Sequence, residues 1–289
     1  MDSFDDLWEQ AELTRRELVA AGAATGYIAG FAASAQPVMA QTAIVTSAAG
    51  MDAGMVQVAT ATGPIPAYRA VKSGSGKRPL ILVVQEIFGV HEHIKDVCRR
   101  LATLGYCAVA PSLYDRQGDV TNLQSIEEIR PIVAKVPDAQ VMTDLDATVK
   151  WAVESGAADA AKVGITGFCW GGRIVWLYAA HKPDLKAGVA WYGRLTGDKT
   201  PNQPAHPVDL AGRIKVPVLG LYGGADAGIP VSTIEDMKNA LGTGTASSFH
   251  VYPDAPHAFF ADYRPSYREA AANDGWQRLQ TWFRQHGLA

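Results

Sequence analysis

A cysteine occupies the point where a strand is expected to give way to a helix, in the segment Gly167-Phe168-Cys169-Trp170-Gly171-Gly172. Residues 162–166 before it favour a strand, and residues 173–180 after it permit a helix. This pattern indicates a nucleophile elbow in which cysteine replaces the usual serine. Glycine is needed at 167 and 171 because a side chain there would clash with the neighbouring strand or helix. The positive end of the following helix favours the thiolate, so we predict that Cys169 is a nucleophile.

A cysteine nucleophile needs a base to take its proton and a carboxylate to orient that base. Asp226 follows the expected strand 218–222 through two glycines, and His257 follows the expected strand ending at Tyr252. The order of nucleophile, acid and base along the chain is the one found in hydrolases with a nucleophile elbow. Asp254 is a rival acid, but it is too close to His257 in sequence for side-on support.

The chain after residue 50 alternates strand and helix signals, which predicts an α/β fold with a mostly parallel sheet and helices on both faces. The ligand site of such a sheet lies at the carboxyl ends of its strands. The expected strands are 64–71, 80–85, 106–110, 162–166, 187–192, 218–222 and 247–252, and the expected helices are 94–104, 125–135, 138–154, 173–180, 232–241 and 267–286.

The length and composition of the chain are those expected of one compact enzyme domain. With 289 residues, of which 48% are hydrophobic, residues 41–289 can form a single domain around a large core. A net charge of −3 and the absence of a basic stripe argue against a nucleic-acid partner. Three cysteines give neither a disulfide framework nor a zinc motif, and we expect Cys98 and Cys107 to be core residues. His91 and His93 are interpreted as a polar helix start, so no metal and no cofactor is expected.

The first forty residues differ from the rest of the chain. Arg15 and Arg16 precede an Ala/Gly-rich run over 20–35, and small residues over 38–40 stand where a signal peptidase would cut. This layout indicates a twin-arginine export signal and a periplasmic protein. The acidic residues of this segment argue against a signal, which is normally basic. The alternative is an amphipathic helix with Phe4, Leu7, Trp8 and Ala11 on one face, packed on the domain of a cytoplasmic protein. We favour export, and the run is too weakly hydrophobic for a permanent membrane anchor.

From about Pro64 to the C-terminus, the chain resembles the dienelactone hydrolases, which are cysteine enzymes of the α/β-hydrolase fold. Six ordered blocks carry the resemblance: Gln85-Glu86-Ile87-Phe88-Gly89-Val90, Ala110-Pro111-Ser112-Leu113-Tyr114-Asp115-Arg116, Gly167-Phe168-Cys169-Trp170-Gly171-Gly172, Trp191-Tyr192-Gly193, Gly223-Gly224-Ala225-Asp226 and His257-Ala258-Phe259. The resemblance implies a triad of Cys169, Asp226 and His257.

The resemblance also implies the roles of the residues around the triad. Glu86 would keep the resting thiol neutral until substrate arrives, and a carboxylate at the end of the buried run 80–85 needs such a site or an ion pair. The backbone N–H groups of Ile87 and Trp170 would form the oxyanion hole. Arg116 would clamp a substrate carboxylate, for which a guanidinium is suited.

The substrate pocket departs from the family pattern at one position. Members of the family carry a second carboxylate-binding arginine four residues after the histidine, where this chain has Ala261. Arg264 is a candidate to replace it; without a replacement, the natural substrate would be another ester or lactone. Tyr192 and Phe88, with Trp170 and Phe259, are expected to form an aromatic wall around the reacting carbonyl.

The predicted function is hydrolysis of lactones or activated carboxylic esters through a thioester at Cys169. Two alternatives remain, a non-catalytic binding protein of hydrolase fold and a protein in which Cys169 is a redox-sensing thiol. The sequence gives neither the natural substrate nor the oligomeric state.

Overall fold

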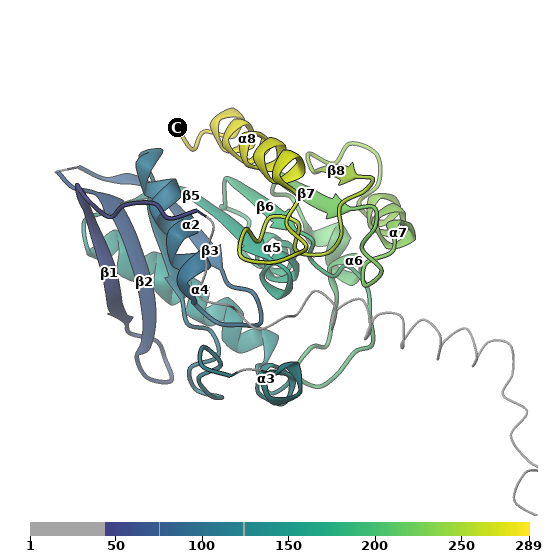
Figure 1. Cartoon of the computed structure of the whole chain (residues 1–289), viewed down its shortest axis with the longest axis horizontal. Helices are drawn as coiled ribbons and strands as arrows, with labels where there is room; N and C mark the ends of the chain where they lie inside the picture. The colour runs from purple at the N-terminus through teal and green to yellow at the C-terminus, as the bar shows by residue number, and fades with distance from the viewer. Residues whose placement is uncertain (1–43, 75, 124) are drawn as a thin grey trace, which may run out of the picture.

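Eight strands form one sheet in the computed structural model, which describes residues 44–74, 76–123 and 125–289. The order across the sheet is β1-β2-β4-β3-β5-β6-β7-β8 (Figure 1). β1 and β2 run antiparallel to their neighbours, and all pairs from β4 to β8 are parallel. The strands are β1 (Met51–Val58), β2 (Ile65–Lys72), β3 (Arg78–Val84), β4 (Cys107–Pro111), β5 (Ala158–Phe168), β6 (Ala187–Trp191), β7 (Val218–Gly223) and β8 (Ser248–Tyr252).

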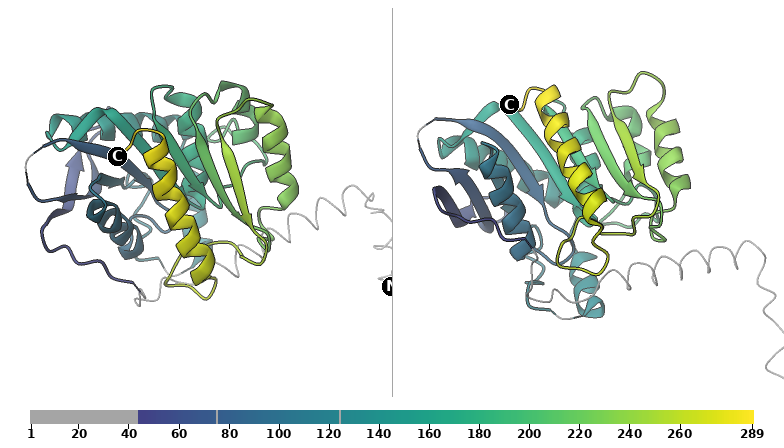
Figure 2. Two further views of the ribbon diagram at one scale, coloured as in Figure 1. Left: turned by 90° about the horizontal axis from the view of Figure 1, so that it is seen from above. Right: turned by 45° about the horizontal axis from the view of Figure 1, so that its top comes forward.

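Helices cover both faces of the sheet (Figure 2). α2 packs on β2 and β4 and α8 on β6 and β7, while α4 and α5 pack on strands of the central sheet. The right-handed crossovers of parallel strands require this two-sided arrangement, because the chain leaves β3 for β4 in one direction and β4 for β5 in the other. The helices are α2 (Glu92–Thr103), α3 (Ile126–Val133), α4 (Asp138–Glu154), α5 (Trp170–His181), α6 (Pro207–Leu210), α7 (Val231–Leu241) and α8 (Glu269–Gln285), with a 3₁₀ turn over Ala211–Arg213.

The core is centred on β3, β5 and α5. Five consecutive residues of β3, 80–84, are fully buried, as expected for a strand covered on both faces. In α5 almost every residue is buried, including Trp176 and Tyr178. This central helix is therefore held from all sides, and its first turn is a rigid platform for the residue before it.

The expected alternation of strands and helices and the mostly parallel sheet are confirmed. Three elements were not foreseen: β1, α6 and the 3₁₀ turn over Ala211–Arg213. β1 is an edge strand with only one fully buried residue, so its sequence lacks the apolar pattern of an internal strand. α6 is a single turn begun by a proline and capped by Asp209. α5 begins at Trp170, directly after the cysteine, and β5 starts at Ala158, earlier than expected.

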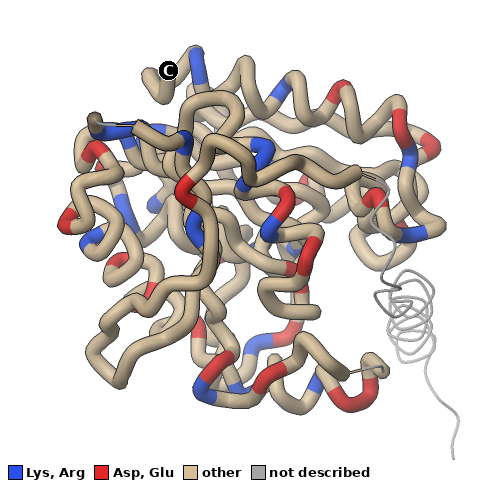
Figure 3. Tube along the Cα trace, turned by 60° about the vertical axis from the view of Figure 1, so that its left-hand side comes forward, with Lys and Arg blue, Asp and Glu red and all other residues tan. Residues whose placement is uncertain are grey.

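Charged residues of both signs are interspersed along the trace in the view of Figure 3. Among the described residues, no helix is long and apolar enough to cross a membrane. Within the same residues, no group of three or more His, Cys, Asp or Glu side chains could hold a metal ion. The predicted export signal over residues 1–40 lies outside the described residues.

Candidate active site

Cys169 lies between the end of β5 and the start of α5, as the elbow pattern predicts. Its backbone has φ 55° and ψ −114°, a conformation that is strained for any residue with a side chain. Such strain costs on the order of 1–3 kcal/mol and persists only where the surroundings enforce it. Here the Cys169 N–H donates to the carbonyl of Trp191 at 3.0 Å, which fixes the turn to β6.

Two glycines allow the turn to pack tightly. A Cβ at Gly167 would lie 2.4 Å from the carbonyl oxygen of Gly171, and a Cβ at Gly171 would lie 2.4 Å from that of Val84. The glycine requirement at both positions is therefore confirmed. Because the first turn of α5 touches the end of β3, Trp170 and Ile87 both come to line the cavity beside Cys169.

Asp226 and His257 form a hydrogen-bonded pair at the carboxyl ends of β7 and β8. His257 Nδ1 lies 2.6 Å from Asp226 Oδ2, and both side chains are buried. The other carboxylate oxygen of Asp226 accepts from the Gly228 N–H at 2.9 Å. Asp226, rather than Asp254, is thus the carboxylate that orients the imidazole.

The two loops that carry this pair are bonded to each other. Gly224 N–H donates to the Tyr252 carbonyl at 2.7 Å, and Ala225 N–H donates to the Ala255 carbonyl at 3.1 Å. A Cβ at Gly223 would lie 2.2 Å from the Ala255 carbonyl oxygen, so glycine is required for this approach. The hydrogen bond between Asp226 and His257 is therefore set by backbone contacts.

The surroundings of His257 favour its charged form. Burial lowers the pKa of His257, but the negative charge of Asp226 and the proximity of Cys169 outweigh it and hold this pKa well above its usual value. Tyr192 packs edge-on against His257 with ring centroids 5.1 Å apart. The φ of Tyr192 is 38°, so this contact also rests on an unusual backbone conformation.

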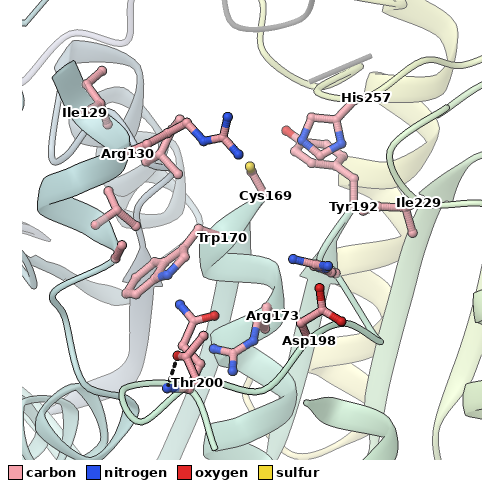
Figure 4. A pocket seen from close by; sticks show the side chains of 15 residues that line it. Ile129, Arg130, Cys169, Trp170, Arg173, Tyr192, Asp198, Thr200, Ile229 and His257 are labelled. Carbon is pink, nitrogen blue, oxygen red and sulfur yellow. Dashed lines mark hydrogen bonds between the residues drawn. The ribbon is translucent and has the colours of Figure 1, made fainter. Parts of the chain in front are cut away.

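Cys169, Trp170, Tyr192 and His257 line one cavity of about 390 Å³ at the carboxyl edge of the sheet (Figure 4). The rest of the wall consists of aliphatic side chains and several polar ones: Ile87, Ile129, Arg130, Val133, Ala134, Arg173, Arg194, Asp198, Thr200, Gln203 and Ile229. The structure thus brings together the predicted nucleophile, the predicted base and both residues of the predicted oxyanion hole.

Glu86 is the centre of a buried polar cluster. The Tyr263 hydroxyl donates to Glu86 Oε2 at 2.6 Å, and His91 Nε2 lies 3.3 Å from the same oxygen. Next to this cluster, His93 Nδ1 lies 3.2 Å from Asp262 Oδ1. His91 and His93 therefore each lie beside a separate carboxylate.

The cluster keeps Glu86 ionised. Burial raises the pKa of Glu86, but the hydrogen bond with His91 and the positive charge of Arg264 outweigh burial and hold this pKa well below its usual range. Tyr192 and Arg264 each interact electrostatically with both Glu86 and Cys169.

The two arginines predicted to bind a substrate carboxylate, Arg116 and Arg264, do not line the cavity. Arg116 does not line the cavity; its guanidinium donates to Asp144 and, at 3.2 Å, to Thr60. Asp144 is a buried carboxylate and requires such a cation. Arg264 is buried, with its guanidinium 4.4 Å from the centroid of Phe88, and neither Arg264 nor Phe88 lines the cavity.

Sequence reasoning missed Tyr263 and Arg130. Tyr263 precedes the noted Arg264, but nothing in the local pattern shows that its hydroxyl reaches an acid 177 positions earlier. Arg130 lies on α3, and only the packing of that helix over the cavity makes it a lining residue. The remaining cysteines, Cys98 and Cys107, are fully buried as expected, and burial raises the pKa of Cys107 to about 11.

Comparison with known proteins identifies the family to which the chain belongs. A family model described as "Dienelactone hydrolase family" matches residues 65–287. The chain is 60% identical to a Methylorubrum extorquens protein named "Putative carboxymethylenebutenolidase", with all of both chains covered. It is 53% identical to a Salmonella typhimurium protein of the same name, over 91% of this chain and 98% of the other.

A solved structure is similar as well. The structure titled as a putative dienelactone hydrolase from Klebsiella pneumoniae is 54% identical, with a TM-score of 0.79, and covers 81% of this chain and 99% of that one. Together with the mostly parallel sheet and the elbow between β5 and α5, these matches show an α/β-hydrolase fold. The chain is therefore a hydrolase that belongs to the dienelactone hydrolase family.

Proposed function

We propose that this hydrolase cleaves lactones or activated carboxylic esters through a thioester on Cys169. The observation that carries the proposal is the 2.6 Å hydrogen bond between Asp226 and His257 in the wall of the cavity that also holds Cys169. A base oriented by a carboxylate beside an elbow nucleophile is the arrangement that acyl transfer requires.

The reaction has two halves. When substrate binds, the Cys169 thiol loses its proton to His257, the thiolate attacks the carbonyl carbon, and the oxyanion accepts hydrogen bonds from the Ile87 and Trp170 N–H groups. The C–O bond then breaks, and the leaving alkoxide or enolate takes the proton from His257, which becomes a neutral base. One oxyanion donor contributes roughly 10²–10³ in rate. Water, losing a proton to His257, then attacks the thioester, and the sulfur leaves. A thiolate leaves more readily than an amine, so peptides are poor substrates.

Glu86 is proposed to keep the resting site inactive. Its ionised carboxylate repels a second negative charge on Cys169, so the thiol stays neutral until substrate binds. The buried hydrogen bonds from Tyr263 and His91 support this role because they hold the carboxylate in place.

Steady-state hydrolysis of a carboxylated dienelactone, followed by ultraviolet absorbance, tests the proposal. Turnover is expected for the wild type and a loss of more than about a thousandfold for Cys169→Ala. Stoichiometric acylation of Cys169 without turnover would instead indicate a binding protein. Sulfenic acid at Cys169 after peroxide, with no esterase activity on any ester, would indicate a redox-sensing thiol.

A further inference from the structure

The cavity beside Cys169 offers more positive than negative charge. Among the residues that the structure describes, its wall includes three arginines, Arg130, Arg173 and Arg194, and one carboxylate, that of Asp198. Arg173 is neutralised within the fold, since both of its terminal nitrogens donate to the carboxylate of Asp138 at 2.7 Å. Of the other arginine and aspartate side chains on this wall, Arg130 and Arg194 are positive and Asp198 is negative.

Arg130 is the cation best placed to meet a ligand. It is exposed on α3, and among the described residues no carboxylate forms an ion pair with it. In Figure 4 it extends from α3 over the cavity on the side opposite His257, with Cys169 between the two. Its helix neighbours Ile129 and Val133 line the same wall with apolar side chains.

The wall around Arg130 combines a cation with the aliphatic side chains of Ile129 and Val133. Such a wall suits a ligand that carries an anionic group at the end of an apolar segment.

We propose that Arg130 forms a carboxylate subsite on the α3 side of the cavity. The substrate would be an ester or lactone whose carboxylate lies several bonds from the scissile carbonyl, with an aliphatic segment along Ile129 and Val133. This subsite replaces the clamp expected at Arg116, which Asp144 holds outside the cavity. The proposal rests on the hydrolase function proposed above and specifies its substrate class.

A matched pair of substrates tests the subsite. 4-Nitrophenyl hydrogen adipate carries a remote carboxylate, and its methyl ester is the neutral counterpart. In Arg130→Gln, the ratio of kcat/KM for the acid to that for the methyl ester is expected to fall about fivefold, mainly through KM, as for a partly exposed ion pair. Arg130→Lys should retain part of the preference.

The control variant is Lys135→Gln, which removes an exposed cation near the end of the same helix that does not line the cavity. The ratio is expected to stay at the wild-type value in this variant. An unchanged ratio in Arg130→Gln, or an equal fall in Lys135→Gln, would overturn the subsite.

A second measurement separates the subsite from the proposed function. Adipate itself is expected to slow alkylation of Cys169 by iodoacetamide, and Arg130→Gln should need about a fivefold higher adipate concentration for the same protection. Absence of turnover with both nitrophenyl esters would contradict the hydrolase function, while this protection would still support the subsite. Equal protection in both proteins would overturn the subsite even if both esters are hydrolysed.

Discussion

Replacing Tyr263 with Phe removes one oxygen atom from the buried cluster around Glu86. The wild-type hydroxyl donates to Glu86 Oε2 at 2.6 Å, and both residues are almost inaccessible to water. The phenyl ring would keep its edge-on contact with His91, at 5.2 Å between centroids, and its position 5.0 Å from the Arg264 guanidinium. The substitution therefore removes the hydroxyl's hydrogen bond to the buried charge of Glu86, together with its longer 3.5 Å contact with His91 Nε2 and its interaction with Arg264.

The expected loss in free energy of unfolding follows from the negative charge of Glu86. A hydrogen bond to an ionised group contributes about 1.5–3 kcal/mol, and no water can reach Glu86 to replace it. We expect Tyr263→Phe to lower the free energy of unfolding at pH 7 by this amount. The loss of the donor also raises the pKa of Glu86, because the hydrogen bond stabilised the ionised carboxylate.

The pH dependence of the free energy of unfolding gives a second test of this hydrogen bond. The pKa of Glu86 in the folded protein lies below its unfolded value of about 4.3, so its stabilisation is complete above that value and is lost as the pH falls through the folded pKa. In Tyr263→Phe that folded pKa is higher. The difference in free energy of unfolding between the wild type and Tyr263→Phe is thus largest at pH 7. It becomes smaller in acid, once Glu86 of the variant is protonated.

Urea unfolding followed by circular dichroism measures both quantities. Tyr267→Phe is the matched control, because the Tyr267 hydroxyl has no hydrogen-bond partner among the residues that the structure describes. A free energy of unfolding within about 0.5 kcal/mol of wild type in Tyr263→Phe, or an equal loss in Tyr267→Phe, would refute the reasoning.

Three further predictions follow from the site and the chain ends. In Asp226→Asn, the alkaline limb of kcat/KM should move to lower pH, because the Asp226 charge raises the pKa of His257; a limb that stays in place contradicts this role. Gly193→Ala should cost at least about 1–3 kcal/mol in urea unfolding, since its Cβ would lie 2.2 Å from the backbone of α5; wild-type stability would show that the contact is not tight. We propose export of the chain, so N-terminal sequencing from the native host should begin near Gln41, and an intact N-terminus would exclude cleavage.

Local sequence was enough for the elements and for the order of the main site residues. The apolar run of β3 and the glycines at 167 and 171 have local causes: burial on both faces in one case and a tight turn in the other. The parallel connections then place Cys169, Asp226 and His257 at one edge of the sheet, whatever the details of packing.

Partners of charged side chains could not be predicted in the same way. The sequence places Glu86 at the end of a strand, but the pairing of its carboxylate with the Tyr263 hydroxyl depends on how the loop after β8 folds over the loop after β3. Arg116 shows the converse: its motif suggested a substrate clamp, and a buried carboxylate on α4 binds it instead.

The sequence by itself determined the alternating strands and helices, the cysteine elbow and the acid and base that follow later strands, because each depends on residues close together in the chain. Only the tertiary structure decided which cations face the cavity. Arg130 lines it, while Arg116 and Arg264 do not. A charged side chain is long, and its partner is chosen by distance in space and by the cost of leaving a buried charge unpaired.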